Sequence, residues 1–355
     1  MSTKNNFTVS AIICEFNPLH SGHKRLIDYA KSISDAVVCI MSGNFTQRGM
    51  PACCDKHSRA RHAILAGADL VLELPTVFAT SSAENFALGG VAIAKQLGAN
   101  YLVFGSECGS MEQLEQCANL LEQPQTNDKI KQLVATGMSY PTAVAKATDC
   151  DVLQSPNNTL AVEYIKAIKT LGANITPKTL QREDNFHGQP QEFASSSALR
   201  KNGKLLQKFS FDFVACDVDD GIEQKYKAVA PHVLSLKTKA QLEQIEGATE
   251  GLHNRIFACN KQNGFDQMMA EIKTKRYTMA KLQRVVLASI LDVTKQTIET
   301  AKTETPQTSV LAMRNGFGHL LQQVNQGLDD VTKRADIFYQ SLGGKPSPTK
   351  MQVLN

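Results

Sequence analysis

Short hydrophobic runs alternate with longer amphipathic segments through the first part of the chain. The runs cover residues 9–14, 36–42, 70–74 and 101–104 and are almost continuously apolar, which is typical of strands buried on both faces. Between them, three segments carry apolar side chains at helical spacing, at residues 23–33, 56–68 and 83–97. This alternation predicts an α/β fold with a doubly wound parallel sheet of the Rossmann-like kind. Because such sheets bind ligands at the carboxyl ends of their strands, the loops after the runs are the candidate site.

The pattern becomes mostly helical after the fourth run. It is helical over residues 111–171, apart from a polar loop at residues 154–158 that precedes a helix beginning near Thr159. Residues 179–182 predict one more strand.

Length and composition suit two domains. The chain has 355 residues and is 42% hydrophobic, which is enough for two packed cores. We place the boundary at residues 201–204, which are rich in Lys, Gly and Asn. Residues 1–204 are expected to form the α/β domain, and residues 205–355 a mostly helical second domain that includes a helix at residues 279–291.

The composition predicts a cytoplasmic protein without a membrane partner. The longest apolar runs, such as residues 36–41 and 69–74, are far shorter than the ~20 residues of a membrane span. Residues 1–6 lack the apolar core of a signal peptide. The nine cysteines are scattered and odd in number, so we expect buried free thiols in a reducing compartment.

A formal net charge of +4 is too small to predict a polycation, so any nucleic-acid contact has to rest on local features. One helical segment is locally basic, and we predict that four of its cations bind RNA phosphates. The alternative is a solvated helix face. These four residues are Lys275, Arg276, Lys281 and Arg284.

The loop after the first strand carries the sharpest motif, His20-Ser21-Gly22-His23, directly before a helix. Gly22 lets a bulky anion approach the backbone, and the first helical N–H groups and the helix dipole favour negative charge there. The two imidazoles add hydrogen-bond donors. The alternative is an ordinary loop or half of a metal site. A structural zinc is disfavoured because the sequence has no Cys-x-x-Cys pair, and we expect no metal bound by the protein itself.

Two further loops carry phosphate or carboxylate chemistry. After the second strand, glycines, amides and a guanidinium suit a small carboxylate or a phosphate, although a polar surface loop remains the alternative. Later, Ser195 begins a helix-like run of serines that ends at Arg200, where backbone N–H groups and a fixed positive charge favour phosphate. Between them, Arg182 and His187 are further candidates for the nucleotide. The second-strand loop offers Gly43, Asn44, Gln47 and Arg48, and the serine run offers Ser196 and Ser197.

The strand, loop and helix around His20 and His23 resemble the signature of the nucleotidyltransferase superfamily that includes the small adenylyltransferases and the class I aminoacyl-tRNA synthetases. In that superfamily the histidine pair contacts ATP phosphates and stabilises charge as pyrophosphate leaves. A later Ser-rich signature with a basic residue grips the triphosphate. The resemblance therefore implies catalytic roles for His20, His23 and Arg200.

The resemblance narrows when further segments are included. Taken in order, they are similar to the bacterial tRNA(Met) cytidine acetate ligase family over most of the chain, with the last sixty or so residues least diagnostic. The matching segments are residues 15–23, 43–49, 72–75, 82–87, 104–107, 156–158, 250–256 and 274–284.

This resemblance implies an ATP-dependent ligase. It would activate acetate to acetyl-adenylate with ATP and Mg²⁺, and transfer the acetyl group to the 4-amino group of the wobble cytidine of elongator tRNA(Met), giving N4-acetylcytidine. Coenzyme A and an obligate protein partner are not expected. The position of the loop leaves open whether Asn157 or Asn158 contacts ATP. The other ATP contacts implied are Ile13, Cys14, Glu15, Phe16, Asn17, Pro18, Leu19, His20, Ser21, Gly22, His23, Lys24, Arg25, Leu26, Gly105 and Arg182.

Two other functions share some of these features. A small-molecule adenylyltransferase would have the same histidine loop, but it would not need residues 205–355. A nucleotide-binding or RNA-binding protein without turnover would not need His20, His23 and Arg200 intact.

Overall fold

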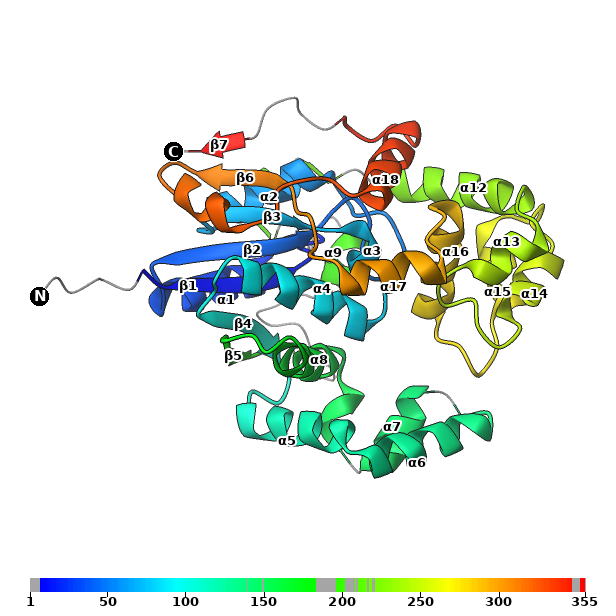
Figure 1. The fold of residues 1–355 in the computed structure, drawn as a ribbon. Coiled ribbons are helices and arrows are strands. Elements are labelled where there is room, and N and C mark those ends of the chain that lie inside the picture. The colour runs from blue at the N-terminus through cyan, green and yellow to red at the C-terminus, as the bar shows by residue number, and fades with distance from the viewer. Residues whose placement is uncertain are drawn as a thin grey trace, which may run out of the picture.

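A seven-stranded sheet forms the centre of the computed structural model (Figure 1). The structure describes residues 7–138, 140–148, 150–182, 196–201, 208, 210–215, 217–218, 221–346 and 352–354. The strand order is β5-β4-β1-β2-β3-β6-β7, and only the β3–β6 pair is antiparallel. The predicted α/β class is thus confirmed. The strands are β1 (Val9–Cys14), β2 (Ala36–Ser42), β3 (Leu70–Leu74), β4 (Tyr101–Ser106), β5 (Thr176–Gln181), β6 (Val310–Arg314) and β7 (Gln352–Leu354).

Helices cover both faces of the sheet, as a doubly wound fold requires. On one face, side chains of α1 (Ser21–Ser32) and α2 (Lys56–Leu65) pack on β1, β2 and β3. On the other face lie α4 (Ala83–Gln96) and α8 (Pro156–Thr170). The short helix α3 (Thr76–Ala79) follows β3 directly and is buried.

Two groups of helices lie outside these layers (Figure 1). One group follows β4 and consists of α5 (Met111–Glu122), α6 (Pro124–Ala135), α7 (Tyr140–Thr148) and the 3-10 helix η1 (Asp151–Gln154). The other group, which we call the helical lobe, spans residues 221–290. It contains α12 (Gly221–Ser235), α13 (Lys239–Gln244), α14 (Leu252–Ala258), α15 (Phe265–Ile272) and α16 (Met279–Ile290). The remaining described helices are α9 (Ser196–Lys201), α11 (Asp212–Ala215), α17 (Lys295–Thr303), η2 (Gly318–Gln323) and α18 (Asp330–Ser341).

The sheet does not end with the first 204 residues. The sequence pattern predicts a separate, mostly helical domain over residues 205–355, and the helical lobe fits that pattern. However, β6 pairs with β3 and β7 pairs with β6, so the chain returns from the lobe to extend the sheet. Without β6, β3 would be an edge strand with unpaired N–H and C=O groups, and the returning apolar segment pairs these groups.

A second difference concerns the segment before α8. The helix begins at Pro156, inside the polar loop that we placed before Thr159. Proline at the first helical position costs no hydrogen bond, because that N–H has no intrahelical partner anyway.

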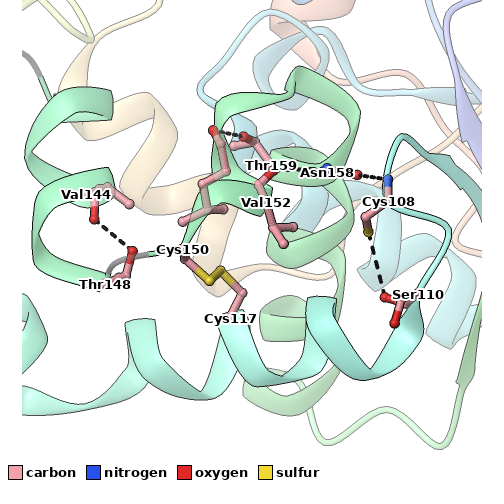
Figure 2. Close-up of a disulfide and its surroundings, with 10 residues drawn as sticks. Cys108, Ser110, Cys117, Val144, Thr148, Cys150, Val152, Asn158 and Thr159 are labelled. Atoms are coloured by element: carbon pink, nitrogen blue, oxygen red, sulfur yellow. Dashed lines mark hydrogen bonds between the residues drawn. A yellow bond between two sulfur atoms is a disulfide. The ribbon is translucent and has the colours of Figure 1, made fainter. Parts of the chain in front are cut away.

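The cysteines also differ from the expectation of free thiols. Cys117 in α5 and Cys150, just before η1, form a disulfide with their Cα atoms 6.5 Å apart (Figure 2). The other six cysteines that the structure describes are free: Cys14, Cys39, Cys53, Cys54, Cys108 and Cys259.

Strand register brings the candidate loops together. Cys14 pairs with Met41 at the end of β1 and β2, and Ser42 pairs with Leu74 at the end of β2 and β3. Because these strands are parallel and end at the same level, the loops that follow them lie at one edge of the sheet.

Candidate active site

His20 is the N-cap of α1. Its backbone is extended, and its Nδ1 accepts a hydrogen bond from the Gly22 N–H at 3.2 Å. A Cβ atom at position 22 would lie 3.1 Å from the Cε1 atom of His20, closer than most real Cβ contacts. Glycine thus leaves room for the imidazole to fold back over the first turn of the helix.

The rings of His20 and His23 are stacked, with their centroids 3.8 Å apart. Phe16 packs beside His23, with the two ring centroids 5.0 Å apart. Burial lowers the pKa of His23 well below 6.5, and His20 and Arg182 lower it further. The Nδ1 atom of His23 is buried and has no hydrogen-bond partner among the residues that the structure describes. A neutral imidazole with an unused polar atom is suited to a ligand.

A buried arginine joins the loops that follow β1 and β2. Arg59 of α2 is fully buried, and its Nη1 donates to the carbonyl oxygens of Glu15 at 2.7 Å and Ser42 at 3.1 Å. Its Nη2 also donates to the carbonyl of Gly43. This role is not apparent from the sequence, because one arginine in an amphipathic helix looks like a surface residue.

Glu15 is the acidic group between these loops. Its Oε1 accepts a hydrogen bond from the Gln47 N–H at 2.7 Å. Burial raises the pKa of Glu15, while the Gln47 hydrogen bond and the positive charges of Arg59, Arg48 and Arg200 oppose that rise. The two predicted phosphate cations, Arg48 and Arg200, thus both lie near the carboxylate that precedes the histidine loop.

The helix α9 docks directly on the histidine loop. The Arg200 guanidinium donates to the carbonyl of Asn17, and the Ser196 hydroxyl donates to the carbonyl of Pro18 at 3.3 Å. The structure therefore brings the late Ser/Arg element to the loop that contains His20. Ser195 and His187 lie outside the described residues, as does the side chain of Ser197.

Gly105, Arg182 and the two asparagines meet at the ends of β4 and β5. A Cβ atom at Gly105 would lie 3.1 Å from the Cγ atom of Arg182. The Asn158 Oδ1 accepts from the N–H groups of Glu107 at 2.8 Å and Cys108 at 3.2 Å, and the Asn158 Nδ2 donates to the Val152 carbonyl. Figure 2 shows the bond between Asn158 and Cys108. Asn158 is buried and uses both polar atoms of its amide to shape this loop.

Asn157 is in a different position from Asn158. It is only partly buried, and its Nδ2 donates to the Glu107 Oε1 at 2.7 Å. The other oxygen of Glu107 accepts from the Asn158 N–H at 2.8 Å, so this carboxylate also caps the first turn of α8.

Two residues of the second-strand loop contact a buried ionic network. The ammonium of Lys56 contacts the carboxylates of Glu73, at 2.8 Å and 2.9 Å, and Asp336, at 2.6 Å. The Asn44 Nδ2 donates to Asp336 at 3.0 Å, while its Oδ1 accepts from the Lys56 N–H. A Cβ atom at Gly43 would lie 2.4 Å from Glu73. Gly43 and Asn44 therefore anchor the loop, and Gln47 and Arg48 lie closer to Glu15.

The residues predicted as ATP contacts in β1 and α1 differ in exposure. Ile13, Phe16 and Leu19 are buried core residues, so their side chains position the loop. The Asn17 Oδ1 accepts a hydrogen bond from the Cys53 N–H at 2.7 Å. Lys24 pairs with Asp28 on the exposed side of α1.

The four predicted RNA contacts lie in or just before α16. Lys275 is exposed. Arg276 forms an ion pair with Glu250 at 3.1 Å, and Lys281 lies over the ring of Tyr277, 4.9 Å from its centroid. Arg284 points toward the sheet instead, where its Nη1 donates to the Gln47 carbonyl at 3.3 Å.

No helix in the described part of the chain is both long and apolar enough to cross a bilayer. Within the same residues, no group of three or more His, Cys, Asp or Glu side chains is arranged to hold a metal ion.

The fold and the His20–His23 loop define a nucleotidyltransferase, and comparison with known proteins agrees. The model of the HIGH Nucleotidyl Transferase family matches residues 7–336. The chain is 32% identical over 352 residues to the tRNA(Met) cytidine acetate ligase of Clostridium perfringens, covering 90% of this chain and 87% of that protein. It is 35% identical over 316 residues to the ligase of the same name from a Thermoanaerobacter species, covering 81% and 79% of the two chains.

Comparison with solved structures indicates the same family. The crystal structure of Thermotoga maritima TmcAL bound with alpha-thio ATP is 25% identical, covers 95% of both chains and has a TM-score of 0.82. An apo form of that protein has a TM-score of 0.84. The chain belongs to the tRNA(Met) cytidine acetate ligase family and is a ligase. The resemblance noted in the sequence is thus confirmed.

Proposed function

We propose that this ligase joins acetate to the wobble cytidine of elongator tRNA(Met) in two steps, with ATP consumed in the first. In the first, an acetate oxygen attacks the α-phosphorus of ATP, the bond to the β-phosphate breaks and pyrophosphate leaves. In the second, the cytidine 4-amino nitrogen attacks the acetyl carbon, loses a proton and releases AMP. The product is N4-acetylcytidine, and coenzyme A takes no part.

The observation that carries this proposal is the contact between α9 and the histidine loop at one edge of the sheet. The stacked pair of His20 and His23 lies on the first turn of α1, and Arg200 from α9 docks on the loop before it. Imidazoles, helix N–H groups and a guanidinium are what a departing pyrophosphate requires, since adenylation depends on positioning and on neutralising charge. ATP would enter with Mg²⁺ as part of the substrate.

Arg48 and Gln47 are the residues of the second-strand loop that we assign to acetate. The Gln47 N–H donates to Glu15 and the charge of Arg48 acts on the same carboxylate, whereas Gly43 and Asn44 contact the buried ionic network. An arginine binds a carboxylate through a forked pair of hydrogen bonds, which would hold acetate in line for attack.

Of the two asparagines, we assign Asn157 to ATP. Both polar atoms of the Asn158 amide are bonded, to Glu107, Cys108 and Val152, whereas Asn157 is partly exposed and, among the described residues, its amide nitrogen donates to Glu107 alone. Gly105 and Arg182 at the neighbouring strand ends would complete this side of the nucleotide site.

The helical lobe would bind the tRNA. Lys275 is exposed, and Arg276 and Lys281 lie on the same part of the lobe, so several backbone phosphates can be contacted at once. The target base must leave its stack to reach the activated acetyl group.

The test is transfer of labelled acetate. The protein is incubated with labelled acetate, ATP, Mg²⁺ and total tRNA, and the labelled RNA is isolated and digested to nucleosides. We expect label in a single tRNA, as N4-acetylcytidine, only when ATP is present. Label on a small molecule with no label on RNA would indicate an adenylyltransferase instead. Label from acetyl-coenzyme A in the absence of ATP would contradict the proposal.

A further inference from the structure

The turn that follows β2 lies between the histidine loop and the helical lobe. It spans residues 46–50, with the Gly49 N–H donating to the Thr46 carbonyl at 2.8 Å and the Thr46 N–H to the Met50 carbonyl at 3.0 Å. Gly49 has a φ of +73°, a left-handed conformation that favours glycine. The turn is therefore held by its own hydrogen bonds, and the N–H and C=O groups that these bonds do not use can contact other elements.

On one side the turn touches the backbone of α16 directly. A Cβ atom at Gly49 would lie 2.4 Å from the Arg284 nitrogen and 2.5 Å from the Gln283 carbonyl carbon. The hydroxyl of Tyr226, in α12, is 3.5 Å from the Gly49 carbonyl oxygen. The turn thus packs against two helices of the lobe with no room for a side chain.

Both backbone polar groups of Gln47 are held by side chains from opposite sides. Its N–H donates to the Glu15 Oε1 at 2.7 Å, and its carbonyl accepts from the Arg284 Nη1 at 3.3 Å. Arg48 follows directly in the chain, and its charge acts on both Glu15 and Arg200. The contacts run without a gap from α16 through Gln47 to the segment that precedes His20.

Arg284 is unlike its basic neighbours. Lys275 is exposed and suited to an RNA phosphate, whereas Arg284 is partly buried and reaches back to the sheet. Burial lowers the pKa of Arg284, as expected for a guanidinium that packs between two elements.

We propose that Arg284 is a positioning residue for the activation step, and that it fixes Gln47 and Arg48 over Glu15 while joining the helical lobe to the adenylation site. This inference rests on the proposed function, because it assigns Gln47 and Arg48 to acetate. It changes the role of Arg284 from a tRNA contact to a link between the two parts of the enzyme.

The test separates binding of tRNA from positioning of acetate. Steady-state acetylation is measured for wild type, Arg284→Gln, Arg284→Lys and Lys275→Gln, with acetate varied at saturating tRNA and tRNA varied at saturating acetate. Lys275→Gln is the matched control, because it removes an exposed cation from the same lobe. Thermal unfolding of each variant shows that it is folded.

At saturating tRNA, Arg284→Gln is expected to decrease kcat/KM for acetate by about tenfold or more, since small misplacements of reacting groups have large kinetic costs. Arg284→Lys should restore part of that activity, and Lys275→Gln should show a raised KM for tRNA alone. Gly49→Ala disturbs the same contact from the sheet side, so it should show the same decrease in kcat/KM for acetate, and it replaces Arg284→Gln in the test if Arg284→Gln is unfolded. Full recovery of Arg284→Gln at saturating tRNA would overturn the inference. Failure of the wild type to acetylate tRNA would overturn the proposed function, and the inference with it.

Discussion

The imidazole rings of His20 and His23 lie stacked, with their centroids 3.8 Å apart at the first turn of α1. This arrangement requires that His20 fold back over Gly22, and it leaves the buried Nδ1 of His23 without a hydrogen-bond partner among the described residues. His20 caps the helix, and in the function proposed above it also contributes one of the two imidazoles that bind the nucleotide. The two functions can be separated by substitution.

His20→Asn is expected to preserve the helix cap but to decrease the rate of adenylation. Asparagine is among the best N-cap residues, whereas His20→Ala should lower the free energy of unfolding by about 1 kcal/mol. Both variants should decrease the adenylation rate on the order of 100-fold, about 3 kcal/mol, because the imidazole is absent when charge moves to pyrophosphate. Urea unfolding and acetate-dependent ATP–pyrophosphate exchange measure the two effects. Near-normal exchange by His20→Asn would show that His20 serves only as a cap.

His23 should make the ligand-free protein less stable in mild acid. Its pKa is lowered well below 6.5 by burial, so the unfolded chain takes up a proton at a higher pH than the folded one. Stability is thus full above about pH 6.5 and falls as the pH decreases below it, by up to about 1.4 kcal/mol per pH unit. His23→Gln should flatten this dependence between about pH 6.5 and 5. The control His232→Gln, at an exposed position in α12, should leave the slope unchanged. Equal slopes for wild type and His23→Gln would show that the folded protein does not lower the pKa of His23.

The ionic network below the second-strand loop should be costly to break. Lys56→Met would leave Glu73 and Asp336 buried without their cation, and removing one partner of a buried pair typically costs about 3–5 kcal/mol. Lys333→Met is the control, because Lys333 pairs with Asp330 on the exposed side of α18, where solvent screens the pair and its loss should change stability little. Urea unfolding of both variants makes the comparison. A destabilisation at Lys56 as small as that at Lys333 would mean that solvent reaches the network.

The contrast between predicted and unpredicted features has a physical basis. The buried parallel strands were predictable because their apolar runs are continuous, and Val9–Cys14 begins and ends where the pattern indicates. The pairing of β6 with β3 could not be predicted, because no local sequence pattern indicates which distant segment will pair with an edge strand. The same holds for the contact between Arg284 and Gln47, which are 237 residues apart in the chain. Arg59 was missed because its neighbours in α2 do not reveal that its guanidinium is buried.

The salt dependence of tRNA binding should reveal which cations meet phosphates. The logarithm of the tRNA association constant falls as the logarithm of the salt concentration rises. Replacing Lys275 and Lys281 by Ala should make this dependence shallower by about one unit of slope for each phosphate that the variant no longer binds, because fewer counterions are released. Arg276→Ala should have a smaller effect, since its charge is already paired with Glu250. Titrations of tRNA(Met) at several salt concentrations measure these slopes. An unchanged slope in the Lys275 and Lys281 variants would place the tRNA on another surface.

The most direct test of acetyl transfer through an adenylate follows the oxygen atoms of acetate. If an acetate oxygen attacks the α-phosphorus, that oxygen stays on phosphorus when the cytidine amine takes the acetyl group. Acetate labelled with ¹⁸O in its carboxylate is therefore incubated with the enzyme, ATP, Mg²⁺ and tRNA(Met), and the nucleotide products are analysed by mass spectrometry. The account predicts one ¹⁸O atom in AMP for each acetylcytidine formed, and unlabelled pyrophosphate. Label in inorganic phosphate together with ADP, or AMP without ¹⁸O, would contradict it.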